Sequence, residues 1–295
     1  MPFLRSNQSA STRSSVRPRP PLFRALGHRE PPEAVDIDGE RFNRAEILKH
    51  DSWAATAIYA SANRRAICKF NRESAALGLP LRWLGRWLAA RERRFMERLR
   101  GVAGVPAGLG AVYVAGRTLP NAVARTFVAG HALAAHERVD DDFFPRLVDI
   151  LAEVHRRGVA HVDLHKRENI LVDDAGRPHL IDFQIAWAAA RGGVAAVCCG
   201  PLLGILQRCD DYHLLKHRLR LRPDQVPTGQ ADLDRLRPAW IRLHRLVAVP
   251  FRTLRRGLLV RLGIRTAAGH VESESFPEVA HRPVGHAAAA WGRAA

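Results

Sequence analysis

The sequence predicts an α+β protein of two lobes, the first built from strands with one long helix and the second mainly helical. Two apolar segments, Ser52 to Ala60 and Arg65 to Phe70, flank a short polar turn and are typical of paired strands. Apolar residues recur at three- and four-residue steps from Leu84 to Arg100 and again from Asp141 to Arg157, as in amphipathic helices. A chain of 295 residues can bury a core in each lobe.

The other elements follow in order along the chain. Strands are predicted from Ala111 to Val114 and from Ala124 to Val128, and Ala129-Gly130 then leads into the second lobe. That lobe is expected to hold a hairpin around Asp174 to Arg177, a helix from Asp210 to Arg222 and basic helices from Leu236 to Arg265. We therefore divide the chain into a disordered basic tail (1–35), the first lobe (36–128), the second lobe (129–265) and a second disordered tail (266–295).

The charge balance of the chain is unusual. Lys and Arg number 46 against 29 Asp and Glu, a formal net charge of +17, which implies a polyanionic neighbour such as a membrane surface, a nucleic acid or a phosphorylated substrate. The cysteines have no metal-ligand spacing and indicate free thiols in a reducing compartment. The longest uncharged run, Gly192 to Gln207, is too short to span a bilayer, so no transmembrane helix is predicted. The Arg- and Ser-rich amino terminus also fits a transit peptide.

Two motifs of the second lobe carry most of the functional information. The first runs from His161 to Val172 and holds Asp163 and Asn169 on a predicted loop. The second, Leu180 to Phe183, places Asp182 at the end of an apolar strand. Phosphate transfer from ATP needs a carboxylate that orients or deprotonates the acceptor hydroxyl, together with oxygen ligands for Mg²⁺. The two motifs supply these groups.

The order of these motifs resembles the catalytic loop and metal-binding aspartate of the protein-kinase-like superfamily. The resemblance implies a two-lobed protein-kinase-like fold with a reduced helical C-lobe, ATP as phosphate donor and Mg²⁺ as cofactor. It makes Asp163 the catalytic base or hydroxyl-orienting residue. Asn169 and Asp182 become the metal ligands, and Asp182 joins Mg²⁺ to the phosphates of ATP. Asp210 or Asp211 resembles the aspartate at a helix start that braces the catalytic loop.

The loop is one residue longer than the family pattern, because Asn169 follows Asp163 by six positions rather than five. A one-residue bulge can keep both ends in place and shifts the cations between them. The resemblance gives Lys166 the catalytic role of the loop lysine that neutralises the γ-phosphate, with Arg167 and His165 as weaker candidates.

A lysine inside an apolar strand indicates a second part of the site. Lys69 lies in the run Ile67-Cys68-Lys69-Phe70, and a buried lysine needs an anionic partner. By the resemblance, Lys69 binds the α- and β-phosphates of ATP and pairs with a glutamate of the following helix. Glu92 is the first candidate for that glutamate and Glu97 the second. The alternative is an edge-strand lysine that points to water.

Several features depart from protein kinases. No glycine lies between Asp51 and Lys69, so the Gly-rich phosphate loop is missing and fewer backbone N–H groups can approach the phosphates. Gln184 replaces the glycine of Asp-Phe-Gly. The segment from Gln184 to Cys209 holds no Ser, Thr or Tyr and no Ala-Pro-Glu ending, which argues for a non-protein acceptor.

Within the superfamily, the chain is most similar to bacterial lipopolysaccharide-core kinases, the group of Kdo and heptose kinases. The shared features are an Asp-Leu-x…Asn-Ile-Leu loop, an Asp-Phe not followed by Gly and a reduced C-lobe, over roughly Trp53 to His217. Aminoglycoside and choline phosphotransferases share a loop of this kind, but they typically carry glycine where Val162 stands.

The region from Leu236 to Arg265 holds eight arginines and no acidic residue, interleaved with aromatic and aliphatic residues. Two helices separated at Pro250 and lying in an anionic membrane interface would show this pattern. A pair of C-lobe helices with solvated arginines is the alternative. Nucleic acid is the least favoured partner, because no recognised nucleic-acid module is present.

The sequence thus predicts an ATP- and Mg²⁺-dependent kinase that phosphorylates a hydroxyl of a lipopolysaccharide-core sugar or a similar glycolipid. We expect a cytoplasmic protein in peripheral contact with the inner face of the membrane through residues 236–265. Two alternatives stay open: an atypical compact Ser/Thr protein kinase, with a protein as substrate, and a catalytically weak, membrane-associated pseudokinase.

Overall fold

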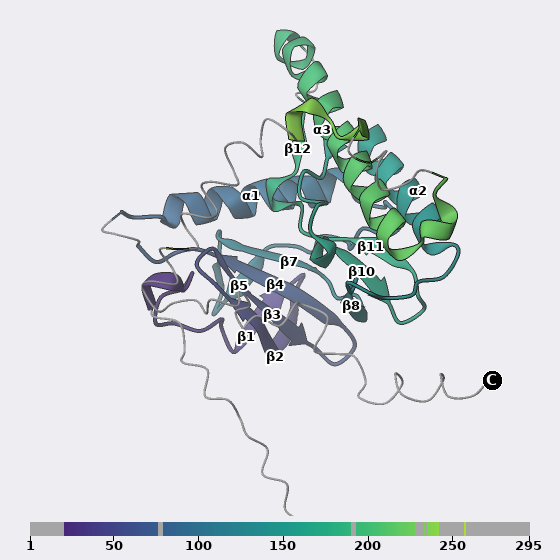
Figure 1. Cartoon of the computed structure of the whole chain (residues 1–295). Helices are drawn as coiled ribbons and strands as arrows, with labels where there is room; N and C mark the ends of the chain where they lie inside the picture. The colour runs from purple at the N-terminus through teal and green to yellow at the C-terminus, as the bar shows by residue number, and fades with distance from the viewer. Residues whose placement is uncertain are drawn as a thin grey trace, which may run out of the picture.

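The computed structural model describes residues 21–75, 79–189, 193–227, 233, 235–241 and 257, without the side chains of residues 193–198. The predicted tail at 266–295, the first twenty residues and most of the predicted basic region 236–265 lie outside the described residues. Figure 1 shows a sheet with α1 lying across it and, beside the sheet, a second group of elements around α2 and α3.

Seven antiparallel strands form the sheet of the first lobe, in the order β6-β5-β1-β2-β3-β4-β7. Four strands were predicted within two residues of their observed ends, since their apolar runs are bounded by polar turns. They are β3 (Ala54–Ala60), β4 (Arg65–Asn71), β5 (Val112–Val114) and β7 (Ala122–Thr126), and β6 (Arg117–Thr118) completes a small hairpin with β5.

The hairpin of β1 (Ala34–Ile37) and β2 (Glu40–His50) was not predicted. Asp38 and Gly39 join the two strands with positive φ values of 53° and 78°. Asp-Gly is a favoured pair for such two-residue turns, because both residues tolerate the left-handed region. The turn signal was therefore present in the sequence, although the polar residues of β2 hid the strand pattern around it.

The residues before β1 also belong to this lobe. Ala25 and Leu26 are buried after the 3-10 turn η1 (Pro21–Phe23), and Ala25 N donates to Asp51 O at 2.7 Å. The prediction of a tail over all of residues 1–35 is therefore wrong for residues 21–35. Their Arg and Pro content resembles that of a tail, but the few apolar residues pack against the sheet.

The sheet curls until its two ends approach each other. β5 pairs with β1 at one end, and Leu109, shortly before β5, donates its N–H to Ala124 O of β7 at 2.9 Å. The curled sheet encloses a core that includes the large side chains of Phe42, Tyr59 and Phe70. This packing fixes the position of β4, the strand that carries Lys69.

Helix α1 (Arg82–Arg98) packs against β4 and β7 and begins and ends two residues before the predicted helix. Gly85 makes this packing possible, since a Cβ atom there would lie 2.0 Å from Arg72 O. The buried face of α1 carries Ala89, Phe95, Met96 and, unusually for a buried position, Glu92.

The second lobe is built on helix α2 (Phe143–Arg156) and a hairpin, and its core joins their apolar side chains to Leu99 and Val102 from the first lobe. The hairpin was predicted from the turn at Asp174 to Arg177, in which Asp173 Oδ1 accepts the N–H groups of Ala175 and Arg177. The remaining elements are β8 (Gly130–Ala132), β9 (Val159–Ala160), β10 (Ile170–Asp173), β11 (Pro178–Leu180), β12 (Trp187–Ala188), α3 (Gly193–Leu221) and the 3-10 turn η4 (Pro223–Gln225).

Helix α3 begins seventeen residues before the predicted start at Asp210, and Pro201 lies inside it. Glycine and proline between Gly192 and Gly204 are ordinarily helix breakers, so local propensity did not predict this extension. The helix nonetheless runs through Pro201, and α3 as a whole packs against β9 and α2. No helix in the part of the chain that the structure describes is long and apolar enough to cross a membrane.

Candidate active site

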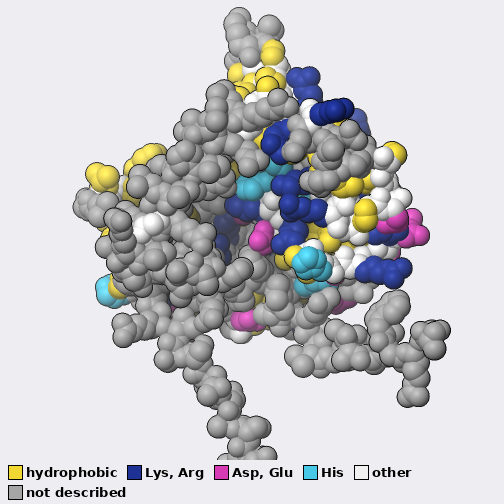
Figure 2. All heavy atoms as spheres, in the orientation of Figure 1, with side chains coloured by type: hydrophobic (Ala, Val, Ile, Leu, Met, Phe, Trp, Pro, Cys, Tyr) yellow, Lys and Arg dark blue, Asp and Glu magenta, His cyan; other side chains and the backbone are white. Residues whose placement is uncertain are grey.

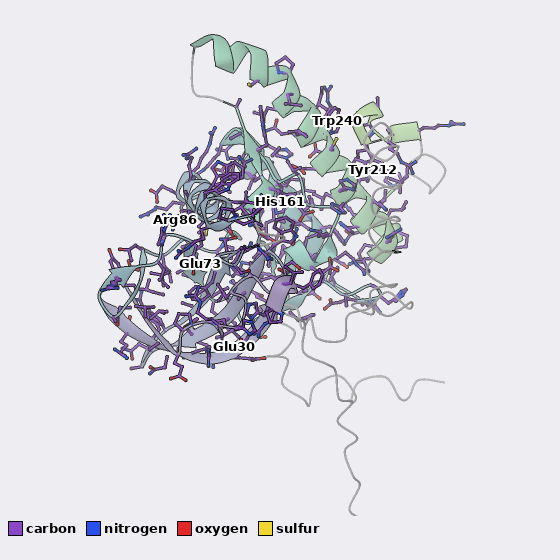
Figure 3. The ribbon with its side chains drawn as sticks, turned by 90° about the vertical axis from the view of Figure 1, so that its left-hand side faces the viewer. Glu30, Glu73, Arg86, His161, Tyr212 and Trp240 are labelled. Atoms are coloured by element: carbon purple, nitrogen blue, oxygen red, sulfur yellow. The ribbon has the colours of Figure 1, made fainter. Side chains whose placement is uncertain are left out.

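The loop that carries Asp163 and Asn169 joins β9 to β10 where the two lobes meet. Figure 3 shows His161, at the start of this loop, between the strands of the first lobe and α3. Asn169 Nδ2 donates to Asp163 O at 3.0 Å, and the 3-10 turn η2 (Arg167–Asn169) leads directly into β10. A tight turn thus accommodates the extra residue of the loop, and a hydrogen bond still links Asp163 to Asn169.

Both oxygens of the Asp163 carboxylate face cationic or imidazole groups. Lys166 Nζ donates to Oδ2 at 2.6 Å, and His165 Nδ1 lies 3.2 Å from Oδ1. The Asp163 side chain is only 5 % exposed, whereas that of Lys166 is 51 % exposed. The Lys166 side chain therefore holds no core position and is free to turn away from the carboxylate. In this structure Lys166 binds Asp163.

Lys69 lies between two carboxylates from distant parts of the chain. Its Nζ donates to Asp182 Oδ1 at 2.8 Å and lies 3.3 Å from Glu92 Oε2. β4 presents Lys69 and α1 presents Glu92, while Asp182 follows β11 with a positive φ of 62°. Glu97, the second candidate, pairs with exposed Arg100 instead. The structure therefore brings Lys69, Glu92 and Asp182 together.

Burial and neighbouring charges shift the pKa values of Lys69, Glu92 and Asp182 in opposite directions. Burial alone would lower the pKa of Lys69, but the carboxylates of Asp182 and Glu92 outweigh it and hold that pKa above its ordinary value. Burial and the negative charge of Asp182 raise the pKa of Glu92, and together they outweigh the lowering effect of Lys69. For Asp182, the charge and hydrogen bond of Lys69 outweigh burial and keep the pKa well below the usual range. Asp182 is thus an anion at neutral pH.

Asn169 and Asp182 are neighbours because of the hairpin register. Ile170 pairs with Leu180, and Ile181 N donates to Asn169 O at 3.0 Å. Since Asn169 Nδ2 is bound to Asp163, the amide oxygen is the atom that can face a cation. Carboxylate and amide oxygens fit Mg²⁺, which also takes oxygens from substrate phosphates. The described residues contain no group of three or more His, Cys, Asp and Glu side chains that could hold a metal by themselves.

Asp210 braces the loop of Asp163 and Asn169 from within α3. Its side chain is fully buried, and its two carboxylate oxygens accept the N–H groups of His161 at 2.6 Å and Val162 at 2.9 Å. Val162 has a φ of 68°, which a β-branched residue rarely adopts. Of the two predicted candidates the structure thus selects Asp210, since Asp211 is 62 % exposed. Asp210 lies inside a long helix, which corrects its predicted place at a helix start.

These features form one arrangement. A curled antiparallel sheet presents a lysine to a glutamate on the helix packed against it, and a loop with Asp and Asn precedes a hairpin that ends in a second Asp. A buried aspartate of a later helix holds that loop in place. The chain has a protein-kinase-like fold. The predicted fold class is confirmed, and the C-lobe is reduced, since α2 and α3 make up most of its described helix.

The comparisons with known proteins are as follows. No family model matches the chain. A segment is 37 % identical over 75 residues to the maternal embryonic leucine zipper kinase of Danio rerio, covering 23 % of this chain and only 11 % of that kinase. The solved structure of the Cydia pomonella granulovirus kinase PK-1 has a TM-score of 0.39 and 15 % identity, over 50 % of this chain and 55 % of that chain. Neither is named as a lipopolysaccharide-core kinase, so that narrower resemblance is not supported by these relatives.

The β2–β3 turn occupies the place of the missing Gly-rich loop. Asp51 Oδ1 accepts the N–H groups of Trp53 at 2.7 Å and Ala54 at 2.9 Å, and Lys49 Nζ lies 2.8 Å from Oδ2. Burial alone would raise the pKa of Asp51, but Lys49 and the two N–H donors outweigh it and lower that pKa. The turn thus supplies its own anion to N–H groups that could otherwise face a phosphate. An Asp at the first position of a turn is the sequence signal that could have identified this role.

Two contacts between the lobes were also not predicted. Gln184, at the position of the Asp-Phe-Gly glycine, donates its amide N–H to Asn71 Oδ1 at 2.9 Å. Arg91 of α1 donates to Ala186 O at 2.5 Å, just after the 3-10 turn η3 (Phe183–Ile185). A glutamine in place of glycine therefore ties the residues after Asp182 to the end of β4.

His217 supports the loop of Asp163 and Asn169 from α3 and makes the stability of the protein depend on pH. Its Nε2 lies 2.9 Å from Leu164 O and its side chain is nearly fully buried. Burial is the largest cause that lowers its pKa, to about 4, and nearby cations including Lys216 and Arg167 add to the effect. Because Leu164 O is an acceptor, Nε2 must carry the proton of the neutral ring.

We expect the free energy of unfolding to fall as the pH is lowered from 6.5 to 4. Above pH 6.5, His217 is neutral in both states; below it, the unfolded chain binds a proton that the folded chain rejects until about pH 4. The loss reaches at most about 3 kcal/mol for this residue, and His213, also shifted to about 4, acts in the same direction. Urea unfolding at several pH values measures the slope of the unfolding free energy against pH. His217→Gln should reduce it and His28→Gln, at an exposed site, should not; equal slopes in all three proteins would contradict this account.

Proposed function

We propose that this protein is an ATP- and Mg²⁺-dependent phosphotransferase whose acceptor is a hydroxyl of a lipopolysaccharide-core sugar or a similar glycolipid. The observation that carries the phosphotransferase proposal is the convergence of Lys69 and Asp182 on the loop of Asp163 and Asn169. Bound Mg²⁺ would neutralise charge on the phosphates of ATP.

Each residue of the candidate site has its own role in the proposed reaction. Lys69 would bind the phosphates of ATP, Asp182 would be a ligand of the cation, and Glu92 holds Lys69 in place from α1. Asp163 orients the acceptor hydroxyl and takes its proton, while Lys166 moves from Asp163 to the transferred phosphate. Asn169 supplies its amide oxygen to the cation, since its N–H group is bound to the loop.

The short connection after the hairpin supports a non-protein acceptor. Only residues 189–192 lie between β12 and the first residue of α3. Protein kinases usually hold a peptide acceptor in the corresponding region, which also carries their activating hydroxyl groups. Here no Ser, Thr or Tyr occurs between Gln184 and Cys209, and most of that interval is taken by α3. The narrower choice of a glycolipid as acceptor rests on the lack of these hydroxyl residues and on the net charge of +17.

Phosphate transfer from radiolabelled ATP tests the proposal. The full chain is incubated with Mg²⁺ and, in separate reactions, a lipopolysaccharide and membrane-lipid extract or a mixture of proteins. Label in the glycolipid fraction is the expected result. Label in protein alone would support the compact protein kinase as the function. No label, together with no thermal shift on adding Mg²⁺ and ATP, would support the pseudokinase, for which the capped turn at Asp51 is the specific argument.

A further inference from the structure

The amino-terminal half of α1 exposes tryptophans on its outer face. Leu79 just before the helix is 64 % exposed, Trp83 is 65 % exposed and Trp87 is 53 % exposed. Residues four positions apart in a helix lie one above the other, so Trp83 and Trp87 point in a similar direction. Figure 2 shows hydrophobic side chains gathered at the left edge of the molecule, where Figure 1 places the beginning of α1. Exposed apolar groups in a contiguous row mark interaction sites more often than isolated ones.

Arginines lie beside this row and further along the same helix. Arg82 and Arg86 are exposed in the first turns of α1, Arg94 is exposed further along, and Arg91 stacks on the Trp87 ring at 5.3 Å. The first turn contains no acidic residue, and no side chain caps the helix. Cations near a helix amino terminus oppose the helix dipole, so these arginines do not stabilise the helix locally. Their position is better explained by an anionic partner.

The exposed row is held rigidly. On the opposite face of α1, Gly85 packs against the backbone of Arg72, whose buried guanidinium donates to four carbonyl groups. These acceptors come from three segments of the lobe, and they are Leu22, Ser52, Ser74 and Ala75. The helix therefore cannot roll to bury the tryptophans without breaking a closely packed contact.

We propose that the amino-terminal half of α1 docks on an anionic membrane surface. Trp83 and Trp87 enter the headgroup region, where tryptophan is enriched because its ring is apolar and its N–H is polar. Arg82 and Arg86 bind lipid phosphates beside them. Charge complementarity selects this partner, since the described exposed residues from Leu79 to Trp87 include cations and apolar groups and no carboxylate. This docking goes beyond the proposed function and does not depend on catalysis.

The docking helix is also the helix of the active site. Glu92 follows Trp87 by five residues, about 7.5 Å along the same helix, and pairs with Lys69. A membrane that holds α1 therefore holds one side of the nucleotide site, and it would bring the site close to an acceptor in that membrane.

Vesicle flotation tests the proposal with the full chain. Phosphatidylcholine vesicles with and without phosphatidylglycerol are mixed with wild type, with the double variant Trp83→Ser/Trp87→Ser and with Tyr113→Ser. Tyr113 is 39 % exposed and lies on β5, outside α1 and outside the basic region 236–265, so it is a matched control. We expect wild type and Tyr113→Ser to float with anionic vesicles alike, and the double variant to bind at least about tenfold more weakly.

Three results would overturn the proposal. The first is equal binding by wild type and the double variant, with thermal unfolding showing that both are folded. The second is loss of binding on replacing Arg242 and Arg245 with serine while the double variant still binds, which would assign the contact to the basic region 236–265. The third is a wild-type dimer and a monomeric double variant in light scattering, which would assign this face to a second copy of the chain. A protein without phosphate transfer that still floats leaves the docking intact, so the two proposals fail separately.

Discussion

Replacing Asp163 with asparagine is expected to lower the rate of phosphate transfer about a thousandfold, a typical loss when a positioned general base is removed. The asparagine amide can still accept one hydrogen bond from Lys166, but it cannot take a proton from the acceptor hydroxyl. Asn169 is bound to the backbone carbonyl of Asp163 rather than to its carboxylate, so the loop should keep its shape. ATP affinity should change little.

The measurement is the initial rate of label transfer into the acceptor fraction that wild type phosphorylates, with ATP binding followed by thermal shift. Asp174→Asn, in the exposed β10–β11 turn, makes the same chemical change outside the site and should retain wild-type transfer. A variant at Asp163 that transfers phosphate at the wild-type rate would remove this residue from the mechanism. A variant that loses ATP binding as well would indicate a structural role instead.

Replacing Asp210 with alanine is expected to cost about 3 kcal/mol of unfolding free energy or more, because two backbone N–H groups lose a charged acceptor in a dry site. Asp210→Ala should also lower the rate of phosphate transfer, because Val162 then has no partner that holds it in the left-handed conformation next to Asp163. Urea unfolding measures the first effect. Asp211→Ala, one position along α3 and 62 % exposed, should change stability by less than about 0.5 kcal/mol.

A second substitution separates the hydrogen bonds from the backbone strain. Glycine adopts the conformation of Val162 without steric cost, so Val162→Gly should recover about 1 kcal/mol in the Asp210→Ala protein. An equal loss of stability on adding Val162→Gly to wild type and to Asp210→Ala would contradict this prediction. It would mean that Asp210 does not offset backbone strain at Val162.

The parts of the fold predicted well from the sequence are those whose signal is local. The strands at Ala54–Ala60 and Arg65–Asn71 and the helix at Phe143–Arg156 have apolar patterns bounded by turns, and each pattern matches the face that packs. The β1–β2 hairpin was missed because β2 is polar along most of its length, although its Asp-Gly turn is a local signal. The early start of α3 was missed because glycine and proline between Gly192 and Gly204 disfavour a helix by local propensity.

Some residues of the candidate site could be predicted from local sequence and others could not. Asp163, Asn169 and Asp182 could be selected as a set because they occur within twenty residues in a recognisable order. The sequence favoured Glu92 over Glu97, and only the structure showed which of the two lies on the face of α1 that meets β4. The roles of Asp51 and Gln184 depend on contacts that no sequence pattern in their neighbourhood specifies fully.

The sequence by itself determined which chemical groups this protein has and the order in which they occur, because local strand, helix and loop patterns are written in neighbouring residues. Only the tertiary structure decided that Lys69 and Asp182, 113 positions apart, lie 2.8 Å from each other, and that Asp210 rather than Asp211 holds the loop. The physical reason is that the partners of a buried charge are chosen by the packing of whole elements. That packing depends on the shape of both lobes together and not on the spacing of residues along the chain.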